Sequence, residues 1–172
     1  MKRIGLLSDT HGYLERSVFK HFANCDEIWH AGDIGDVSVI HQLKKFKPLK
    51  AVHGNIDGAD VRACCPEDFR FQCERMDVWI THIGGYPGRY SPRILPQMKT
   101  NPPKLFICGH SHILKVIYDK RFELLHINPG AAGNSGFHKV KTMVRFSIDG
   151  SQVKDLEIIE IKRKSLFVNK GI

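Results

Sequence analysis

The chain has 172 residues, of which 42% are hydrophobic and 26% charged, and its formal net charge is +8. This size and composition fit one soluble globular domain with its own hydrophobic core. No stretch approaches the ~20 apolar residues of a membrane span, and no signal-peptide pattern is present, so we expect no membrane association. We expect residues 1–161 to form the domain and the basic segment 162–172 to be a C-terminal tail, a candidate for disorder.

The positive charge is compatible with two kinds of partner. Lys and Arg are scattered along the chain, with one dense cluster at Lys162–Lys164. A nucleic acid would be attracted by this charge, and so would the anionic phosphate of a smaller substrate. No basic motif interleaved with aromatic residues supports a nucleic-acid-binding module, so nucleic acid is not favoured.

The cysteines indicate a reducing compartment. Their number is odd, they form no CxxC pair, and no secretory pattern accompanies them. They are Cys25, Cys64, Cys65, Cys73 and Cys108. We therefore expect a cytoplasmic protein with reduced thiols.

The first third of the chain has the pattern of successive strand–loop–helix units. Expected strands cover residues 4–7, 27–31 and 49–52, and expected helices cover 15–23 and 37–46. A polar cluster follows each strand, and the clusters are Asp9 with His11, Gly32 with Asp33, and Gly54 with Asn55 and Asp57. Ligands bind beyond the carboxyl ends of such strands, so we expect these clusters to meet at one edge. Helix capping alone would explain the Asp and Asn residues, but not the recurring histidine and glycines.

The remainder adds strands, a proline-rich loop and two more polar clusters. Expected strands are 69–73, 78–81, 104–108, 116–118, 124–127, 143–146 and 153–161. Segment 86–103 reads as a loop with a short helix at 92–98, and Asp149-Gly150 predicts a hairpin turn. His82 follows one strand, and Gly109-His110-Ser111-His112 follows another. The glycine-rich segment 128–134 is either a phosphate-binding loop or a plain tight turn.

Together these motifs resemble those of the calcineurin-like metallophosphoesterase superfamily, and within it the small YfcE-type phosphodiesterases. The matching motifs are Asp9-x-His11, Gly32-Asp33, Gly54-Asn55, His82, Gly109-His110-x-His112 and Asn128-Pro129-Gly130. The resemblance extends to about Glu160. It implies an α/β fold, a four-layer α/β/β/α sandwich of two mixed β-sheets flanked by helices, with the site between the strand ends.

The resemblance also implies a binuclear metal centre. Its first ion would be held by Asp9, His11, Asp33 and His112, and its second by Asp33, Asn55, His82 and His110. Asp33 would bridge the two ions. Mixed nitrogen and oxygen ligands fit Mn²⁺, Fe, Zn²⁺ or Ni²⁺ better than Mg²⁺ or Ca²⁺, and among these we expect Mn²⁺.

The implied activity is hydrolysis of phosphodiester bonds by attack of a hydroxide that bridges two metal ions. Asp33, Asn55 and His82 would be catalytic, and Asn55, Gly130 and His138 would contact the substrate. The expected partner is a small phosphodiester or a nucleotide. Two alternatives are a non-catalytic metal-binding scaffold, similar to a retromer subunit that resembles this family, and a nuclease.

Two positions depart from the family pattern. Many relatives carry a histidine, thought to protonate the leaving group, where this chain has Ile56, and Ile83 separates His82 from Gly84. Small YfcE-type members often lack that histidine as well. The identity of any general acid therefore stays open, with His138 and Asp57 as candidates. His30 and His53 are further candidates for orienting a ligand, or for purely structural roles.

Overall fold

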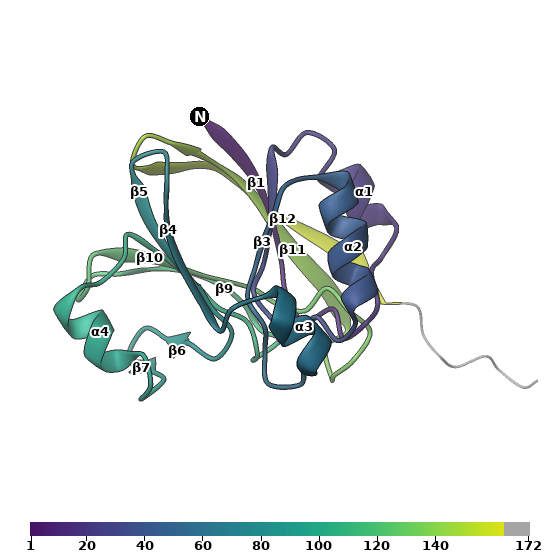
Figure 1. Cartoon of the computed structure of the whole chain (residues 1–172). Helices are drawn as coiled ribbons and strands as arrows, with labels where there is room; N and C mark the ends of the chain where they lie inside the picture. The colour runs from purple at the N-terminus through teal and green to yellow at the C-terminus, as the bar shows by residue number, and fades with distance from the viewer. Residues whose placement is uncertain (164–172) are drawn as a thin grey trace, which may run out of the picture.

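A computed structural model describes residues 1–163 as two β-sheets packed face to face, with helices on their outer sides (Figure 1). The helices are α1 (Ser17–His21), α2 (Val37–Phe46), α3 (Ala59–Cys64) and α4 (Leu95–Thr100). The strands are β1 (Lys2–Leu7), β2 (Glu27–His30), β3 (Leu49–Ala51), β4 (Asp68–Cys73), β5 (Met76–Thr81), β6 (Gly85–Tyr86), β7 (Arg89–Tyr90), β8 (Leu105–Ile107), β9 (Leu114–Asp119), β10 (Leu124–Pro129), β11 (Val140–Asp149) and β12 (Gln152–Lys162). Within these residues, no helix is long and apolar enough to cross a membrane.

Both large sheets are mixed and have five strands. The first has the spatial order β12-β11-β1-β2-β3, and the second has the order β4-β5-β8-β10-β9. Strands β1, β2 and β3 run parallel, and so do β5, β8 and β10. The carboxyl ends of each parallel set meet at one edge, and this edge carries the polar clusters.

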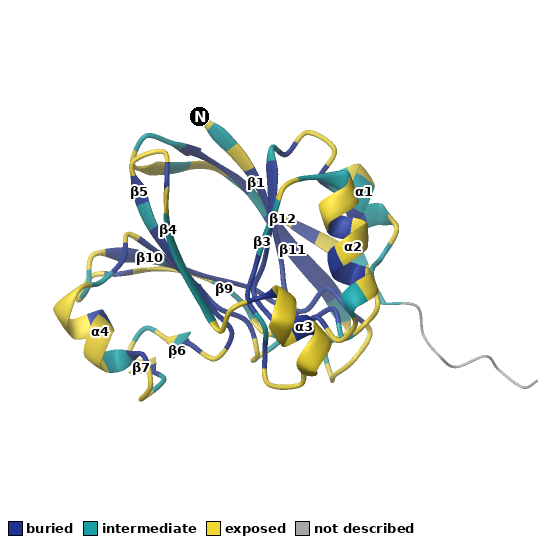
Figure 2. Cartoon of the chain, in the orientation of Figure 1, coloured by how far each residue is buried: buried dark blue, intermediate teal, exposed yellow. Residues whose placement is uncertain are grey.

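Alternate side chains of a strand pack into different hydrophobic cores, one between the two sheets and others between a sheet and its helices. Ile4 and Leu6 of β1 face the second sheet, whereas Leu7 faces the helices. In β8, Ile107 packs between the sheets while Phe106 packs with residues of α4. Successive side chains of a strand point to opposite faces, so buried strands fill two cores at once. Figure 2 shows the result, with buried strands between helices whose outer faces are exposed.

This architecture confirms the predicted α/β sandwich of two mixed sheets. Helix α2 has the predicted bounds, and the Asp149-Gly150 turn joins β11 to β12 as expected, with Asp149 opposite Gln152. Helix α1 is shorter than the predicted 15–23. Residues before Ser17 follow the loop after β1, where the Glu15 carboxylate accepts a hydrogen bond from Lys141 Nζ at 2.7 Å.

Three short elements differ from the sequence prediction. Helix α3 lies in a segment without visible periodicity, because only Val61 of its side chains is buried. The β6–β7 hairpin lies in the segment predicted as a loop. The first residue of the predicted tail, Lys162, belongs to β12, where it pairs with Val140. The rest of the predicted tail, from residue 164, lies outside the described residues.

One buried carboxylate, Glu27 of β2, links its strand to lysines on the two neighbouring strands, Lys2 of β1 and Lys50 of β3. Glu27 is 5% exposed and accepts hydrogen bonds from Lys2, Lys50 and the Trp29 indole. Burial by itself would raise the pKa of Glu27, but these hydrogen bonds outweigh it and lower the pKa to about 2. A carboxyl group with a lowered pKa stabilises the fold above its unfolded pKa of about 4.3, and this contribution disappears as the pH falls toward 2.

We therefore predict that Glu27→Gln lowers the melting temperature at neutral pH, because two ammonium groups lose their counter-charge. The gap to the wild-type chain should narrow as the pH falls from about 4.5 toward 2. Thermal unfolding followed by circular dichroism measures both effects. Glu157→Gln, which removes an exposed pair with Arg145, is the control and should change little at either pH. A gap that stays constant across this pH range would contradict the role of Glu27.

Candidate metal centre

The backbone at the polar edge is strained at the residues predicted to bind metal. Within residues 1–163, eight non-glycine residues have a positive φ, and five of them are predicted metal ligands. Those five, with their φ angles, are Asp9 (55°), His11 (47°), Asp33 (52°), His110 (69°) and His112 (58°). A left-handed conformation costs a non-glycine residue roughly 1–2 kcal/mol, and such strain tends to persist at functional sites.

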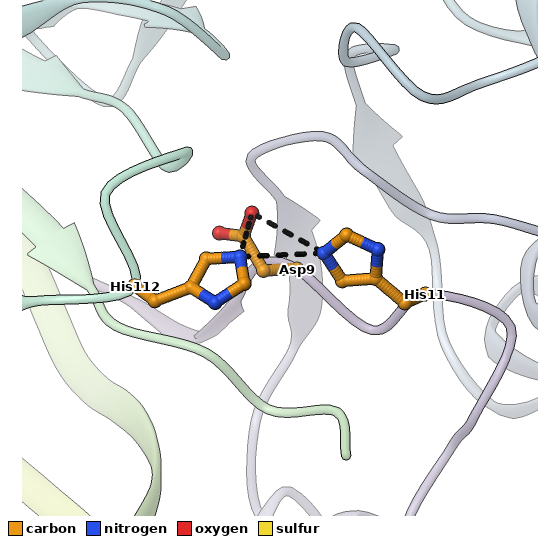
Figure 3. A group of neighbouring side chains, drawn as sticks. All are labelled: Asp9, His11 and His112. Carbon is orange, nitrogen blue, oxygen red and sulfur yellow. Dashed lines mark hydrogen bonds and ion pairs between the residues drawn. The ribbon is translucent and has the colours of Figure 1, made fainter. Parts of the chain in front are cut away.

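Three of these side chains converge from opposite sheets. Figure 3 shows the rings of His11 and His112 directed at each other and at the Asp9 carboxylate. His112 Nε2 lies 3.2 Å from Asp9 Oδ1 and 3.3 Å from His11 Nε2. The hydrogen bond to the Asp9 carboxylate is the largest cause of the raised pKa of His112. Two ring nitrogens and a carboxylate oxygen around one point form a typical divalent metal site.

A second group lies beside the first and consists of Asp33, His82 and His110. His82 Nε2 is 3.1 Å from Asp33 Oδ1, and the rings of His82 and His110 are nearly perpendicular. The other oxygen of Asp33, Oδ2, lies 3.7 Å from Nε2 of His11 in the first group. The Asp33 carboxylate therefore faces both groups, one oxygen toward each.

His82 Nε2 and Asp9 Oδ1 are placed as ligands for a cation. His82 Nδ1 lies 2.8 Å from the Ala31 carbonyl and donates to it, so only the charged ring has a proton on Nε2, and the neutral ring would direct a lone pair toward Asp33. This Nε2 and Asp9 Oδ1 are both buried without a hydrogen-bond partner. Burial would lower the pKa of His82, but the carboxylates of Asp33 and Asp9 outweigh it and raise the pKa. The donor set thus fits a bound metal cation, which would satisfy both orphaned atoms.

The glycines of three motifs leave room for these ligands. A Cβ atom on Gly54 would lie 2.0 Å from Asp33 Oδ1, and one on Gly109 would lie 2.8 Å from Asp9 Oδ2. A Cβ atom on Gly32 would lie 2.5 Å from His82 Nδ1. The recurring glycines therefore follow from close packing around the ligands, which helix capping does not require.

Two buried groups hold the ligand loops together. Asp57 accepts hydrogen bonds from the backbone N–H groups of Ile34, Gly35 and Gly54, at 3.1, 2.7 and 2.7 Å. His30 Nδ1 accepts from the Gly32 N–H group, and its Nε2 then donates to Thr10 Oγ1. Burial lowers the pKa of His30 to about 4, which keeps this ring neutral. Both residues position the loops, so Asp57 is not free to act as a general acid.

The remaining predicted site residues lie in different surroundings. Asn55 is exposed and lines a cavity of about 280 Å³ together with His53 and His82. His53 Nδ1 is 3.3 Å from the Gly54 carbonyl. Ile56 is 47% exposed, and its backbone N–H group donates to Asp33 Oδ1.

The glycine-rich loop is hydrogen-bonded to the loop that carries Asp9. The Gly130 N–H group donates to Asn128 Oδ1 at 3.0 Å, so it is not available to a phosphate. The N–H groups of Ala132 and Gly133 likewise donate to the carbonyls of Ser8 and Asp9. The geometry does not support a phosphate-binding loop at Gly130 and favours the alternative, a tight turn that fixes the Asp9 loop.

His138 packs against His112, a member of the first group. Its Nε2 donates to the Gly133 carbonyl at 2.9 Å, and its Nδ1 is buried without a partner. Its ring lies edge-on against the ring of His112, with the centroids 5.5 Å apart. The pKa of His138 is lowered, and burial of the ring is the largest cause. These contacts place His138 behind a predicted ligand and do not support direct contact with a substrate.

Sequence reasoning missed an arginine beside the site. Arg62 of α3 donates to the carbonyls of Asp57 and Gly54 at 2.6 and 3.2 Å, and it lines the same cavity as Asn55. No periodic pattern marks this short helix, so the sequence offered no signal for Arg62.

Comparison with known proteins assigns the class. Residues 1–151 match the calcineurin-like phosphoesterase superfamily domain, and the chain belongs to this superfamily. A probable metallophosphoesterase from Methanocaldococcus jannaschii is 32% identical over 136 residues, which cover 74% of this chain and 67% of that protein. The family assignment agrees with the metal-binding geometry at the strand ends.

Two solved structures share the fold. The first is described as a novel archaeal phosphodiesterase, with a TM-score of 0.71 and 20% identity over 92% of this chain and 99% of that one. The second is a single mutant of Vps29 from Entamoeba histolytica, with a TM-score of 0.71 and 12% identity over 94% and 99%. At these identities the likeness establishes the architecture alone.

We predict that Asp57→Asn lowers the free energy of unfolding by about 2–4 kcal/mol, because a buried charged acceptor of three N–H groups is lost. The Asp33 loop loses two of these hydrogen bonds, so metal affinity should fall as well. Urea unfolding and metal titration measure the two effects. Asp60→Asn, at an exposed position of α3, is the control and should stay within about 0.5 kcal/mol of wild type. Equal stability of the two variants would refute the bracing role.

Proposed function

We propose that this chain is a metal-dependent phosphodiesterase with two divalent ions per chain. The observation that carries the proposal is the pair of buried acceptors without donors, His82 Nε2 and Asp9 Oδ1, inside two adjoining groups of ligating side chains. Acceptors gathered in this way need positive charge between them. The superfamily match and the archaeal phosphodiesterase fold support the same reading.

The proposed ligands divide between the ions as follows. Asp9, His11, Asp33 and His112 hold the first, and Asp33, Asn55, His82 and His110 hold the second. The two oxygens of Asp33, each facing one group, support its role as the bridge. Asn55 completes the second set from the exposed side.

When bound, such an ion pair supplies a water of lowered pKa as nucleophile and positive charge for the phosphate oxygens. The chain contributes two carboxylates, four neutral imidazoles and one neutral amide, so two divalent ions would leave the site cationic. A phosphodiester anion is therefore attracted to the edge between the sheets. Asn55 and His110 are the exposed members and lie where a substrate phosphate would contact the protein.

The mixed nitrogen and oxygen ligands fit Mn²⁺, Fe, Zn²⁺ or Ni²⁺ better than Mg²⁺ or Ca²⁺, and we propose Mn²⁺ among them. We propose a small phosphodiester or a nucleotide as substrate. All five cysteines are free, which supports action in the cytoplasm.

The second candidate function is a non-catalytic scaffold, because Vps29 shares this architecture. The complete set of seven candidate ligands favours the enzyme. An assay with Mn²⁺ against bis-p-nitrophenyl phosphate and a short nucleic acid separates the possibilities. We expect turnover of the small diester, whereas turnover of the nucleic acid alone would indicate a nuclease, and no turnover a scaffold.

We predict two metal ions per chain after reconstitution with excess Mn²⁺, as measured by elemental analysis. Asp33→Asn should reduce both the ion count and turnover more than Asn55→Ala, because Asp33 contributes negative charge to both ions. Asp36→Asn is the matched control, since it changes an exposed carboxylate of the same loop that caps α2, and asparagine is an equally good cap. One ion or none in the wild-type chain would exclude the binuclear centre.

We also predict a steep dependence of kcat/KM on the pKa of the leaving group. Ile56 cannot donate a proton, and Asp57 and His138 are held by other contacts. A positioned general acid typically contributes 10²–10⁴-fold, most of all for poor leaving groups such as alkoxides. The measurement is a series of aryl and alkyl methyl phosphates at saturating Mn²⁺. A flat series would reveal an acid, and a His138→Ala variant that steepened it would identify His138.

A further inference from the structure

A second cavity lies behind the loop that carries His110 and His112, and the proposed metal centre does not use it. It has a volume of about 60 Å³. Its walls include Tyr86, Ser111, Ile113, Lys115, His126 and Asn128. Tyr86, Ser111 and Ile113 are exposed, whereas His126 and Asn128 are buried lining residues, so an occupant larger than water contacts the His126 ring only when the wall side chains move.

The buried lining presents an imidazole without partners. His126 is 0% exposed, and neither of its ring nitrogens has a hydrogen-bond partner. Burial, helped by the Lys115 charge, lowers the pKa of His126 to about 4, so the ring is neutral and offers one N–H donor. An unsatisfied buried polar group costs about 1–3 kcal/mol. A polar occupant of the cavity would remove this cost.

Ser111 offers a second donor. Its Oγ accepts hydrogen bonds from Asn128 Nδ2 at 3.1 Å and from the Ile113 N–H group at 3.2 Å. These bonds use both lone pairs of the hydroxyl oxygen. Its proton has no acceptor among the described residues, so the hydroxyl can donate to a molecule in the cavity.

Lys115 adds a positive charge. Its Nζ lies 4.0 Å from the centroid of the Tyr86 ring, which fixes the ammonium group at the cavity wall. Within residues 1–163, no carboxylate lies within ion-pair distance of Lys115. No carboxylate lines the cavity, so its electrostatics favour an anion over a cation.

We propose that this cavity binds a small oxyanion of the size of phosphate, held by Lys115, Ser111 and His126. The volume exceeds the ~10–15 Å³ that one water needs, so more than a single water fits. The oxyanion is either free phosphate or a second phosphate on a substrate at the metal centre. Because Ser111 lies between His110 and His112, its occupant contacts the loop that carries two proposed metal ligands.

The test titrates inorganic phosphate into the full chain by calorimetry, once after chelation and once after loading with Mn²⁺. The chelated wild-type chain should bind one phosphate, and Lys115→Gln and His126→Phe should weaken this binding about 10-fold or more. Lys120→Gln, an exposed change just beyond β9, is the matched control and should bind as wild type. No binding by the chelated wild-type chain, or equal binding by all variants, would overturn the proposal and leave a cavity that holds only water.

A second measurement guards against misfolding of the His126 variant. Phosphate should raise the melting temperature of the chelated wild-type chain and of Lys120→Gln, but not that of Lys115→Gln. A phosphate-induced rise in Lys115→Gln equal to that of wild type would contradict the site. This result does not require enzymatic activity, so it is distinguishable from failure of the proposed function.

Kinetics with Mn²⁺ separate the two sources of the oxyanion. If the substrate supplies it, Lys115→Gln lowers kcat/KM about 10-fold more for a phosphodiester with a second, terminal phosphate than for bis-p-nitrophenyl phosphate. Equal changes for the two substrates, together with loss of phosphate binding, assign the cavity to free phosphate.

Discussion

The structure depends on a concentration of hydrogen-bond acceptors that outnumber the donors beside them. His82 donates its Nδ1 proton to the Ala31 carbonyl, and its Nε2 lies 3.1 Å from the carboxylate of Asp33. Asp9 Oδ1 is buried beside them without a partner. Such an arrangement is unfavourable without positive charge, which makes the edge between the sheets a candidate site for metal cations.

The surrounding chain is organised to hold these acceptors in place. Left-handed backbone at five predicted ligands turns their side chains inward, and the cost of this strain is offset by hydrogen bonds between the loops. Asp57 fixes the Asp33 loop to the Gly54 loop, and Asn128 bonds both the Gly109 carbonyl and Ser111 Oγ. The Asp57 carboxylate therefore holds the ligand loops of the first sheet, and the Asn128 amide holds the Gly109–Ser111 loop of the second sheet. These hydrogen bonds keep the ligands close together.

The surface around the centre is less polar than the centre itself. Ile56 and Ile83, the two departures from the family pattern, are both exposed beside predicted ligands. On the other side of the His110–His112 loop, the lining of the cavity beside His126 includes Lys115 and no carboxylate, so the two sides of this loop differ in charge.

The sequence by itself determined the element types and the chemistry at the strand ends. The alternation in β1 and β8 and the helical spacing in α2 are local patterns, and the residue types Asp, His and Asn already carry the ligand chemistry. Only the tertiary structure decided which atoms meet. His11 and His112 are 101 residues apart and face each other because two sheets pack together. The tertiary structure also decided that the Gly130 N–H group bonds Asn128, that the His138 ring packs against the His112 ring, and that His126 has no hydrogen-bond partner. Such contacts depend on distant segments, which no local pattern encodes.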